Sequence, residues 1–196
     1  MSLYFQKVLV VELVHLRMFF QIVVYYEKFL VVSATAVVVS ADLNYFIVSL
    51  KRIYKDYNGL EDILSNNSNG NDLQKRISTF KEIFFSIDHP IRTRKHLPSP
   101  IDGSSAKRFN MFLRWMVRSN EKGVDFGLWN KIDKSELSLP LDVHTGRIAR
   151  LLGLLKRNTN DSKAVEEINL KLREMDPKDP VKYDFALFGL GVYENF

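Results

Sequence analysis

The sequence predicts an all-α protein. Apolar residues recur at helical spacing along most of the chain, and asparagine, glycine and proline separate these stretches. After residue 44, no segment alternates strictly between apolar and polar side chains, as a half-buried strand would. A chain of 196 residues has the length of one domain and can bury about 70% of its unfolded surface.

The helices are expected in this order: residues 44–57, 72–86, 104–118, 125–131, 143–156, 162–175 and 181–189. The first is amphipathic, with Phe46 and Leu50 on its apolar face, and Asn58 and Gly59 are typical helix-ending residues. Three prolines within residues 88–102 predict an extended loop there. The chain therefore reads as a series of short helices.

Residues 1–40 differ from the rest, being rich in valine, phenylalanine, leucine and tyrosine. The longest uncharged run, Phe29–Ala41, has 13 residues, whereas about 20 are needed to cross a bilayer. Charges such as Glu12 and Arg17 also exclude an ordinary signal peptide. We expect an atypical apolar segment at 1–40, a helical domain at 41–196, no membrane partner and a cytoplasmic location.

The positive charge is concentrated in one part of the chain. The formal net charge is +5, and residues 92–118 alone contain seven basic residues and one acid, Asp102. A basic stripe of this kind favours a polyanion such as DNA, although a solvated charged face is the simpler alternative. The residues expected to contact DNA are Arg92, Arg94, Lys95, Arg108, Arg114 and Arg118.

Cysteine is absent, which excludes disulfides, thiolate zinc sites and thiol nucleophiles. The four histidines lack metal-ligand spacing. We therefore expect neither a metal site nor a cofactor.

Two ionisable residues stand out at expected helix starts. Asp142, in the stretch PLDVHTGR, lies where a loop ends and an amphipathic helix begins, so it is also a good N-cap. Lys107, in GSSAKRFNMFLRWMVR, begins another basic and aromatic helix 35 residues earlier. An amine and a carboxylate on neighbouring helix starts could divide nucleophilic and electrostatic work, whereas a solvated or phosphate-binding lysine is the alternative.

These two segments resemble the endonuclease III superfamily of helix-hairpin-helix DNA glycosylases. LDVHTGR matches the family's aspartate-containing segment through Asp142, His144 and Arg147, and GSSAKRFNMFL carries Lys107 where bifunctional members have their catalytic lysine. The glycine-rich hairpin is reduced to Gly103, so the expected motif is degenerate. The resemblance implies catalytic roles for Lys107 and Asp142, and Arg147 joins the expected DNA contacts.

A longer resemblance runs from about Asn44 to Gly191 and includes VDFGLW, PLDVHTGRIARLLGLLKR and DPVKYDFALFGLG. It points to an uncharacterised bacterial family regarded as a distant glycosylase relative, and it covers roughly three quarters of the chain. Members of that family have further helices upstream, so residues 1–40 are expected to be truncated or divergent.

The resemblance implies a helical DNA-glycosylase-like domain that repairs DNA by base excision. Such an enzyme would act as a monomer on double-stranded DNA. It would cleave the glycosidic bond to a damaged base, such as an oxidised purine. The pocket for an extruded base could be lined by Phe109, Phe112, Trp115, Phe126, Trp129 and Phe188, although helical spacing of aromatics equally suits a buried helix face. A non-catalytic DNA-binding module of the same fold and a helical protein-interaction domain remain alternatives.

Overall fold

The computed structural model describes residues 36–66, 72–119, 121 and 123–193. Within these residues the chain forms α-helices and short 3-10 helices and no strand, so the predicted all-α class is confirmed. The chain divides into two compact units, residues 1–45 and 46–196. Residues 1–35 of the predicted apolar segment lie outside the described residues. No helix in the described ranges is long and apolar enough to cross a membrane.

The first helix, α2, runs from Ala36 to Asp56, so it begins earlier than predicted. Its predicted stop is confirmed, because Asn58 (φ 59°) and Gly59 (φ 110°) have left-handed backbone conformations that break the helix. A short helix, α3 (Leu60–Ser65), follows.

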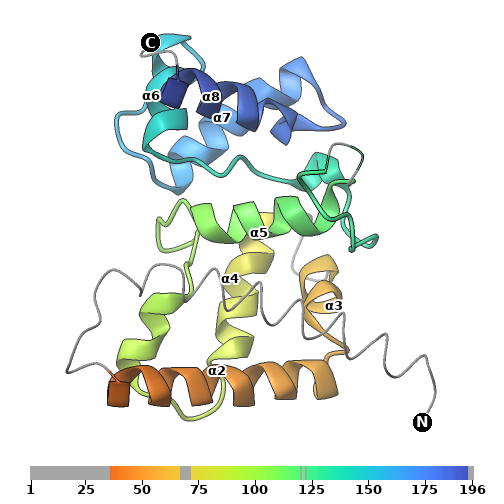
Figure 1. Cartoon of the computed structure of the whole chain (residues 1–196), viewed down its shortest axis with the longest axis vertical. Helices are drawn as coiled ribbons and strands as arrows, with labels where there is room; N and C mark the ends of the chain where they lie inside the picture. The colour runs from red at the N-terminus through yellow and green to blue at the C-terminus, as the bar shows by residue number, and fades with distance from the viewer. Residues whose placement is uncertain (1–35, 67–71, 120, 122, 194–196) are drawn as a thin grey trace. The chain divides into compact units, whose positions relative to one another are not determined.

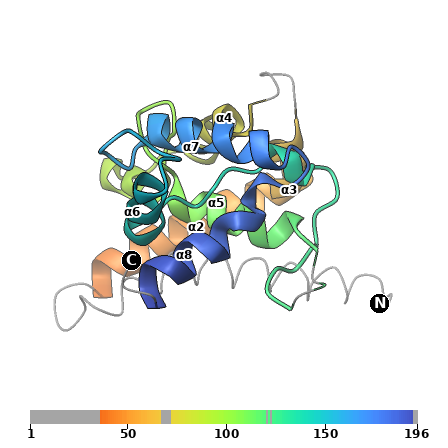
Figure 2. The ribbon, with the colours of Figure 1, turned by 90° about the horizontal axis from the view of Figure 1, so that it is seen from above.

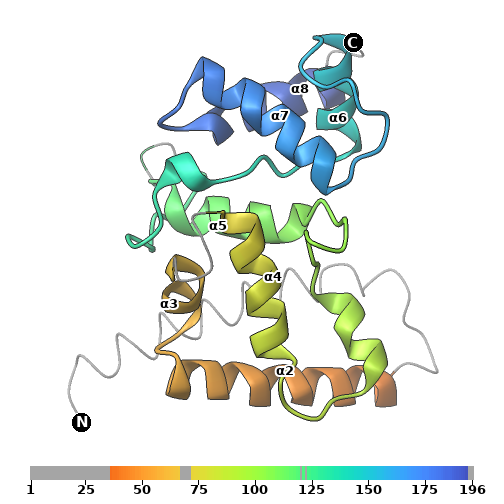
Figure 3. The ribbon, with the colours of Figure 1, turned by 180° about the vertical axis from the view of Figure 1, so that it is seen from behind.

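The N-terminal core of the second unit is aromatic and forms around α4 (Leu73–Phe84), which Asp72 caps through the backbone N–H of Gln74. Phe84 packs edge-on against Phe46 of α2 with ring centroids 4.9 Å apart, and Phe80 lies 5.4 Å from Phe109. Figure 3 shows α4 running between α2 and α5. We use the name N-terminal core for Phe46, Phe80, Phe84, Phe109 and Phe112, all of which are buried.

The predicted extended loop at 88–102 contains a 3-10 helix, η3 (Ile91–His96). Pro90 precedes it in an extended conformation, and its carbonyl accepts the backbone N–H of Thr93 over 2.9 Å, which closes the first turn. The prediction of an extended loop is therefore wrong for these six residues. The remaining loop leads to α5 (Lys107–Val117), which contributes Phe109 and Phe112 to the N-terminal core.

The predicted helix at 125–131 is not formed. Instead, this segment folds back on the end of α5, where the backbone N–H groups of Phe126 and Trp129 donate to the carbonyls of Trp115 and Met116 over 2.7 and 2.8 Å. The last carbonyls of a helix lack partners within the helix, so this tertiary pairing satisfies them. A 3-10 turn, η5 (Lys134–Glu136), follows with a capping box on Asp133.

The C-terminal part contains α6 (Val143–Leu151), α7 (Ser162–Met175), the 3-10 turn η6 (Pro180–Tyr183) and α8 (Asp184–Tyr193). The bounds of α7 agree with the predicted 162–175. These elements enclose a second set of buried residues, the C-terminal core: Leu139, Leu141, Ile148, Ala149, Leu155, Ala164, Val165, Ile168, Leu172 and Leu187. Figure 1 shows α5 between α4 on one side and the group α6, α7 and α8 on the other.

Helices α6 and α8 pack against each other. A Cβ atom added at Gly191 of α8 would lie 3.0 Å from the Cβ of His144 of α6, so glycine permits this close approach. Because α8 continues to Tyr193, Gly191 serves the packing of two helices and does not end one. Figure 2, seen from above, shows α6 and α8 beside each other.

Candidate functional site

Lys107 is the first residue of α5, and its position is set by the loop before it. Gly103 (φ 91°) and Ala106 (φ 48°) turn the chain, and the backbone N–H of Ala106 donates to the Ser104 hydroxyl over 3.1 Å. The Asn110 amide donates to the Ser105 carbonyl over 3.0 Å, which fixes the loop to the first turn of α5. Lys107 therefore starts a helix whose entry is held by several bonds.

Asp142 is the N-cap of α6, as the sequence predicts. Its Oδ1 accepts the backbone N–H of Thr145 over 2.7 Å, and its backbone carbonyl accepts the side-chain amide of Asn160 over 2.9 Å. Asp142 is thus held through both its side chain and its backbone, and the cap restricts the rotamers of the carboxylate.

The structure brings the two predicted catalytic residues together. The Nζ atom of Lys107 lies 3.3 Å from Oδ2 of Asp142, the carboxylate oxygen that does not cap the helix. The Lys107 side chain is 39% exposed and that of Asp142 only 10% exposed, so a ligand can reach the amine while the carboxylate is largely shielded. The pair joins the starts of α5 and α6, two helices that contribute to different cores.

A network of buried charges continues from this pair along α5. Arg114, two turns after Lys107, forms ion pairs with Asp184 of α8 and with Asp125, the latter over 3.3 Å. Arg118 pairs with Asp125 over 2.8 Å and with Asp179 over 3.0 Å. These ion pairs attach α5 to the C-terminal helices through charges, while the opposite face of α5 is apolar.

Asp184, like Asp125, is a buried carboxylate of the network. Burial raises the pKa of Asp184, Arg114 acts in the opposite direction, and the nearby charges of Asp142 and Asp125 raise it further. Asp142 and Asp184 are thus close enough to interact electrostatically, and Asp184 belongs to the surroundings of the Lys107–Asp142 pair.

This shift predicts how stability depends on pH. Because the pKa of Asp184 is raised in the folded protein, the folded state holds this proton more tightly than the unfolded state does. The contribution of Asp184 to the free energy of unfolding should therefore fall as the pH rises from the unfolded value, about 3.9, through the raised value. Denaturation of the wild type and Asp184→Asn across this range measures the difference, and a contribution that grows with pH would contradict it.

Two predicted DNA contacts are corrected by this network. Arg114 is 1% exposed and lies between two carboxylates, with its guanidinium carbon 4.1 Å from the ring centre of Phe185, so it cannot reach a phosphate. The Arg118 side chain is 18% exposed, and two aspartates compensate its charge. Both lie in a basic stretch of sequence, but their counter-ions, Asp125, Asp179 and Asp184, lie outside that stretch.

The other predicted DNA contacts lie at the surface. Arg92, Lys95 and Arg108 are exposed. Arg94 donates to Glu82 over 2.7 Å, which compensates part of its charge. Arg147 of α6 is exposed, and it donates to the Gly191 carbonyl over 2.9 Å.

Three of the residues predicted to line a base pocket are buried. Phe109, Phe112 and Trp129 are buried, and the Phe112 and Trp129 rings pack 5.3 Å apart in the interior. Trp115 is half-buried and packs against Phe126 with a centroid distance of 6.5 Å. The prediction is therefore wrong for the three buried aromatics, because the spacing that could have lined a pocket instead forms a packed helix face.

An exposed aromatic face lies on α8. Phe185 and Phe188 on α8 are 50% and 37% exposed, and the Phe188 ring packs edge-on against the ring of His144 with a centroid distance of 6.0 Å. His144 itself is exposed and lies two residues after Asp142. The sequence predicts Phe188 as a possible pocket aromatic, whereas nothing in it singles out Phe185.

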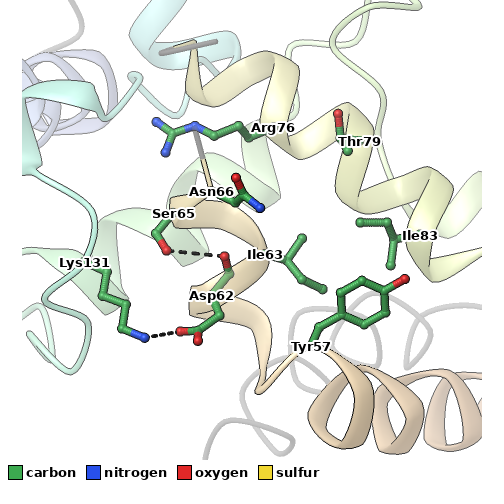
Figure 4. A pocket seen from close by; sticks show the side chains of 9 residues that line it. All are labelled: Tyr57, Asp62, Ile63, Ser65, Asn66, Arg76, Thr79, Ile83 and Lys131. Carbon is green, nitrogen blue, oxygen red and sulfur yellow. Dashed lines mark hydrogen bonds and ion pairs between the residues drawn. The ribbon is translucent and has the colours of Figure 1, made fainter. Parts of the chain in front are cut away.

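Away from the pair, a pocket of about 390 Å³ lies between α3 and α4, and none of the predicted site residues lines it. Figure 4 shows Lys131 reaching Asp62 at one side and Ile63 facing Ile83 at the other. The bond from Lys131 is the main reason that the pKa of Asp62 lies below its usual value. Arg76 in the pocket wall is 2% exposed and forms an ion pair with Glu136. Because its charge is already compensated, we assign Arg76 a structural role.

A family model described as "Protein of unknown function (DUF2400)" matches residues 33–193. No curated protein and no solved structure matches the chain. The family model covers most of the sequence, including both helix starts of the Lys107–Asp142 pair. The chain therefore belongs to the DUF2400 family.

Proposed function

We propose that this protein is a DNA glycosylase, or a glycosylase with lyase activity, that removes a damaged base in base excision repair. The proposed fold is a helical DNA-glycosylase-like domain with a degenerate hairpin before α5. One observation carries the proposal: an amine and a carboxylate that lie 35 residues apart in sequence meet at 3.3 Å. They do so at two helix starts, with the amine accessible from solvent.

Each group has a defined task in the proposed reaction. Lys107 attacks C1′ of the sugar as a neutral amine while the bond to the base breaks, and the base leaves with the bonding electrons. Loss of a proton from the attached nitrogen and opening of the sugar ring give a Schiff base, from which strand cleavage can follow. Asp142 stabilises the positive charge that develops on the sugar, and it is effective because its cap and low exposure hold it in place.

The extruded base would stack on the exposed aromatic face of α8, because Phe109, Phe112 and Trp129 are buried and cannot contact it. Phe188 and His144 are exposed in part, contact each other and lie on the two helices that pack beside Asp142. Stacking on an aromatic ring contributes about 1–3 kcal/mol per base in other proteins. Arg108 and Arg147 would contact the phosphates near the pair, and Arg92 and Lys95 those farther along the duplex.

A second candidate is a non-catalytic DNA-binding module of the same fold. It is favoured by the fact that both oxygens of Asp142 already have partners, Thr145 and Lys107, as a purely structural residue would. This candidate predicts salt-sensitive duplex binding without release of any base.

The decisive experiment incubates the protein with a panel of lesion-bearing duplexes, oxidised purines included, and measures released base and nicked strand. Asp142→Asn should lower the rate of base release on the order of a hundredfold, or about 3 kcal/mol, because it removes the charge that stabilises the transition state. The amide oxygen can still cap α6, so the free energy of unfolding should change by at most about 1 kcal/mol.

Asp161→Asn is a matched control. Asp161 caps α7 with φ −111° and ψ −174°, nearly the values of Asp142 (−112° and −173°), and it accepts the Ala164 N–H over 3.0 Å. It also pairs with an exposed basic residue, Arg157, but lies outside the proposed site. Base release should be normal in this variant. Equal activity of wild type and Asp142→Asn would make Asp142 a cap alone, and a wild type inactive on every lesion would favour the binding module.

A further inference from the structure

A second pocket lies along the exposed face of α6, immediately after Asp142. Its volume is about 580 Å³. It is lined by Val143, Arg147, Arg150, Leu151, Asn158 and Asn160. Val143 and Leu151 are 75% and 60% exposed, so apolar side chains lie toward both ends of the α6 face while the two arginines lie between them. The pocket is thus cationic in the middle and apolar at its ends.

The guanidinium of Arg150 is fixed in place without a counter-ion among the described residues. Its Nε donates to the Arg157 carbonyl over 2.7 Å and its Nη2 to Oδ1 of Asn160 over 2.6 Å, and both acceptors are neutral. Arg114, Arg118 and Arg157 each pair with a carboxylate, but Arg150 forms no ion pair with any residue that the structure describes. Because a guanidinium has five N–H donors, Arg150 keeps donors and a full charge for an anion.

The sequence leaves room for this arrangement at Gly146. A Cβ atom there would lie 2.7 Å from Oδ1 of Asn160 and 3.1 Å from Nη1 of Arg150. Any other residue at this position would displace the two side chains that fix the pocket wall. The Asn160 side chain also donates to the backbone carbonyl of Asp142 over 2.9 Å, so the pocket wall is bonded to the backbone of the residue that carries the proposed catalytic carboxylate.

We propose that this pocket binds a phosphate of a nucleic-acid strand, with Arg150 and Arg147 on the phosphate and with Val143 and Leu151 against the neighbouring sugars. Guanidinium groups suit phosphate because their donors match its oxygens. The choice of a strand over a free nucleotide rests on the proposed function, whereas phosphate binding does not require any catalysis. A strand held here passes directly by Asp142.

Asn158→Asp tests the pocket with little risk to folding, because Asn158 is exposed and the two side chains have nearly the same shape. The variant places a negative charge beside the arginines. Fluorescence anisotropy with a labelled undamaged duplex should show weaker binding than that of the wild type. The slope of log affinity against log salt concentration should become shallower by about one unit, the value for one lost phosphate contact.

Asn130→Asp is the matched control, since Asn130 is exposed and lies in the loop bonded to α3. It makes the same change of net charge and should leave the slope unchanged. Equal slopes in wild type and Asn158→Asp, or a wild type that does not bind duplex, would overturn the proposal.

A second arm separates the two sources of phosphate. Inorganic phosphate and a deoxynucleoside monophosphate are titrated into wild type and Asn158→Asp by calorimetry. A defect confined to the duplex supports the strand, whereas a defect confined to the monophosphate overturns it in favour of a nucleotide site. Absence of base release would remove the proposed glycosylase activity and leave these binding results intact, so the two failures are distinguishable.

Discussion

Replacing Lys107 with Gln is expected to abolish covalent trapping of the protein on a lesion-bearing duplex by borohydride. Borohydride reduces a Schiff base between a lysine and the opened sugar to a stable adduct, which requires the amine that Gln lacks. Duplex affinity should remain close to that of the wild type, because Lys107 is one of several basic residues near the proposed DNA face. Adduct formation is followed as a shifted band on a denaturing gel.

Lys95→Gln provides the comparison. Lys95 is exposed on η3 and carries the same charge, but it lies outside the Lys107–Asp142 pair. This variant should still be trapped, with at most a modest loss of affinity. If Lys107→Gln is trapped as efficiently as the wild type, the nucleophile is a different amine and the proposed role of Lys107 is wrong.

Arg114→Met should destabilise the fold by about 3–5 kcal/mol, because it leaves the buried carboxylate of Asp184 without its cation. The methionine retains much of the packing volume, so the loss is mainly electrostatic. Chemical denaturation monitored by circular dichroism measures it.

A double variant, Arg114→Met with Asp184→Asn, should recover part of this loss, because removing both charges leaves less buried charge uncompensated. Arg108→Met, an exposed neighbour on α5, should stay within about 0.5 kcal/mol of the wild type. A midpoint for Arg114→Met equal to that of the wild type would show that the network does not hold α5 to the C-terminal helices.

Local signals in the sequence were sufficient for much of the fold. The bounds of α7 follow from the Asp161 cap and regular apolar spacing, and the stop of α2 follows from Asn58 and Gly59. The segment 125–131 was predicted as a helix because its apolar residues suit one, but its N–H groups pair with the end of α5. No local pattern carries such a tertiary preference.

The candidate site was likewise predictable where local sequence signals exist and not where it depends on tertiary contacts. Asp142 and Lys107 could be singled out because each stands at a helix start in a distinctive segment, and the structure places them in contact. The partners of Arg114 are distant in sequence, since Asp184 lies 70 residues later, so a basic stretch was read as a DNA surface where the fold forms ion pairs. Aromatic spacing likewise could not distinguish a pocket from a core.

The contact between Lys107 and Asp142 has a consequence for the dynamics of the protein. Lys107 begins a helix of the N-terminal core, and Asp142 begins one whose Ile148 and Ala149 belong to the C-terminal core. Proteins open in cooperative units well below the free energy of global unfolding, and amide hydrogen exchange resolves these units. If α6, α7 and α8 open as one unit, the pair separates while α2, α4 and α5 remain helical. Activity would then disappear at milder conditions than most of the helical signal, and the exchange rates of α6 amides would report the intact site better than the total helix content.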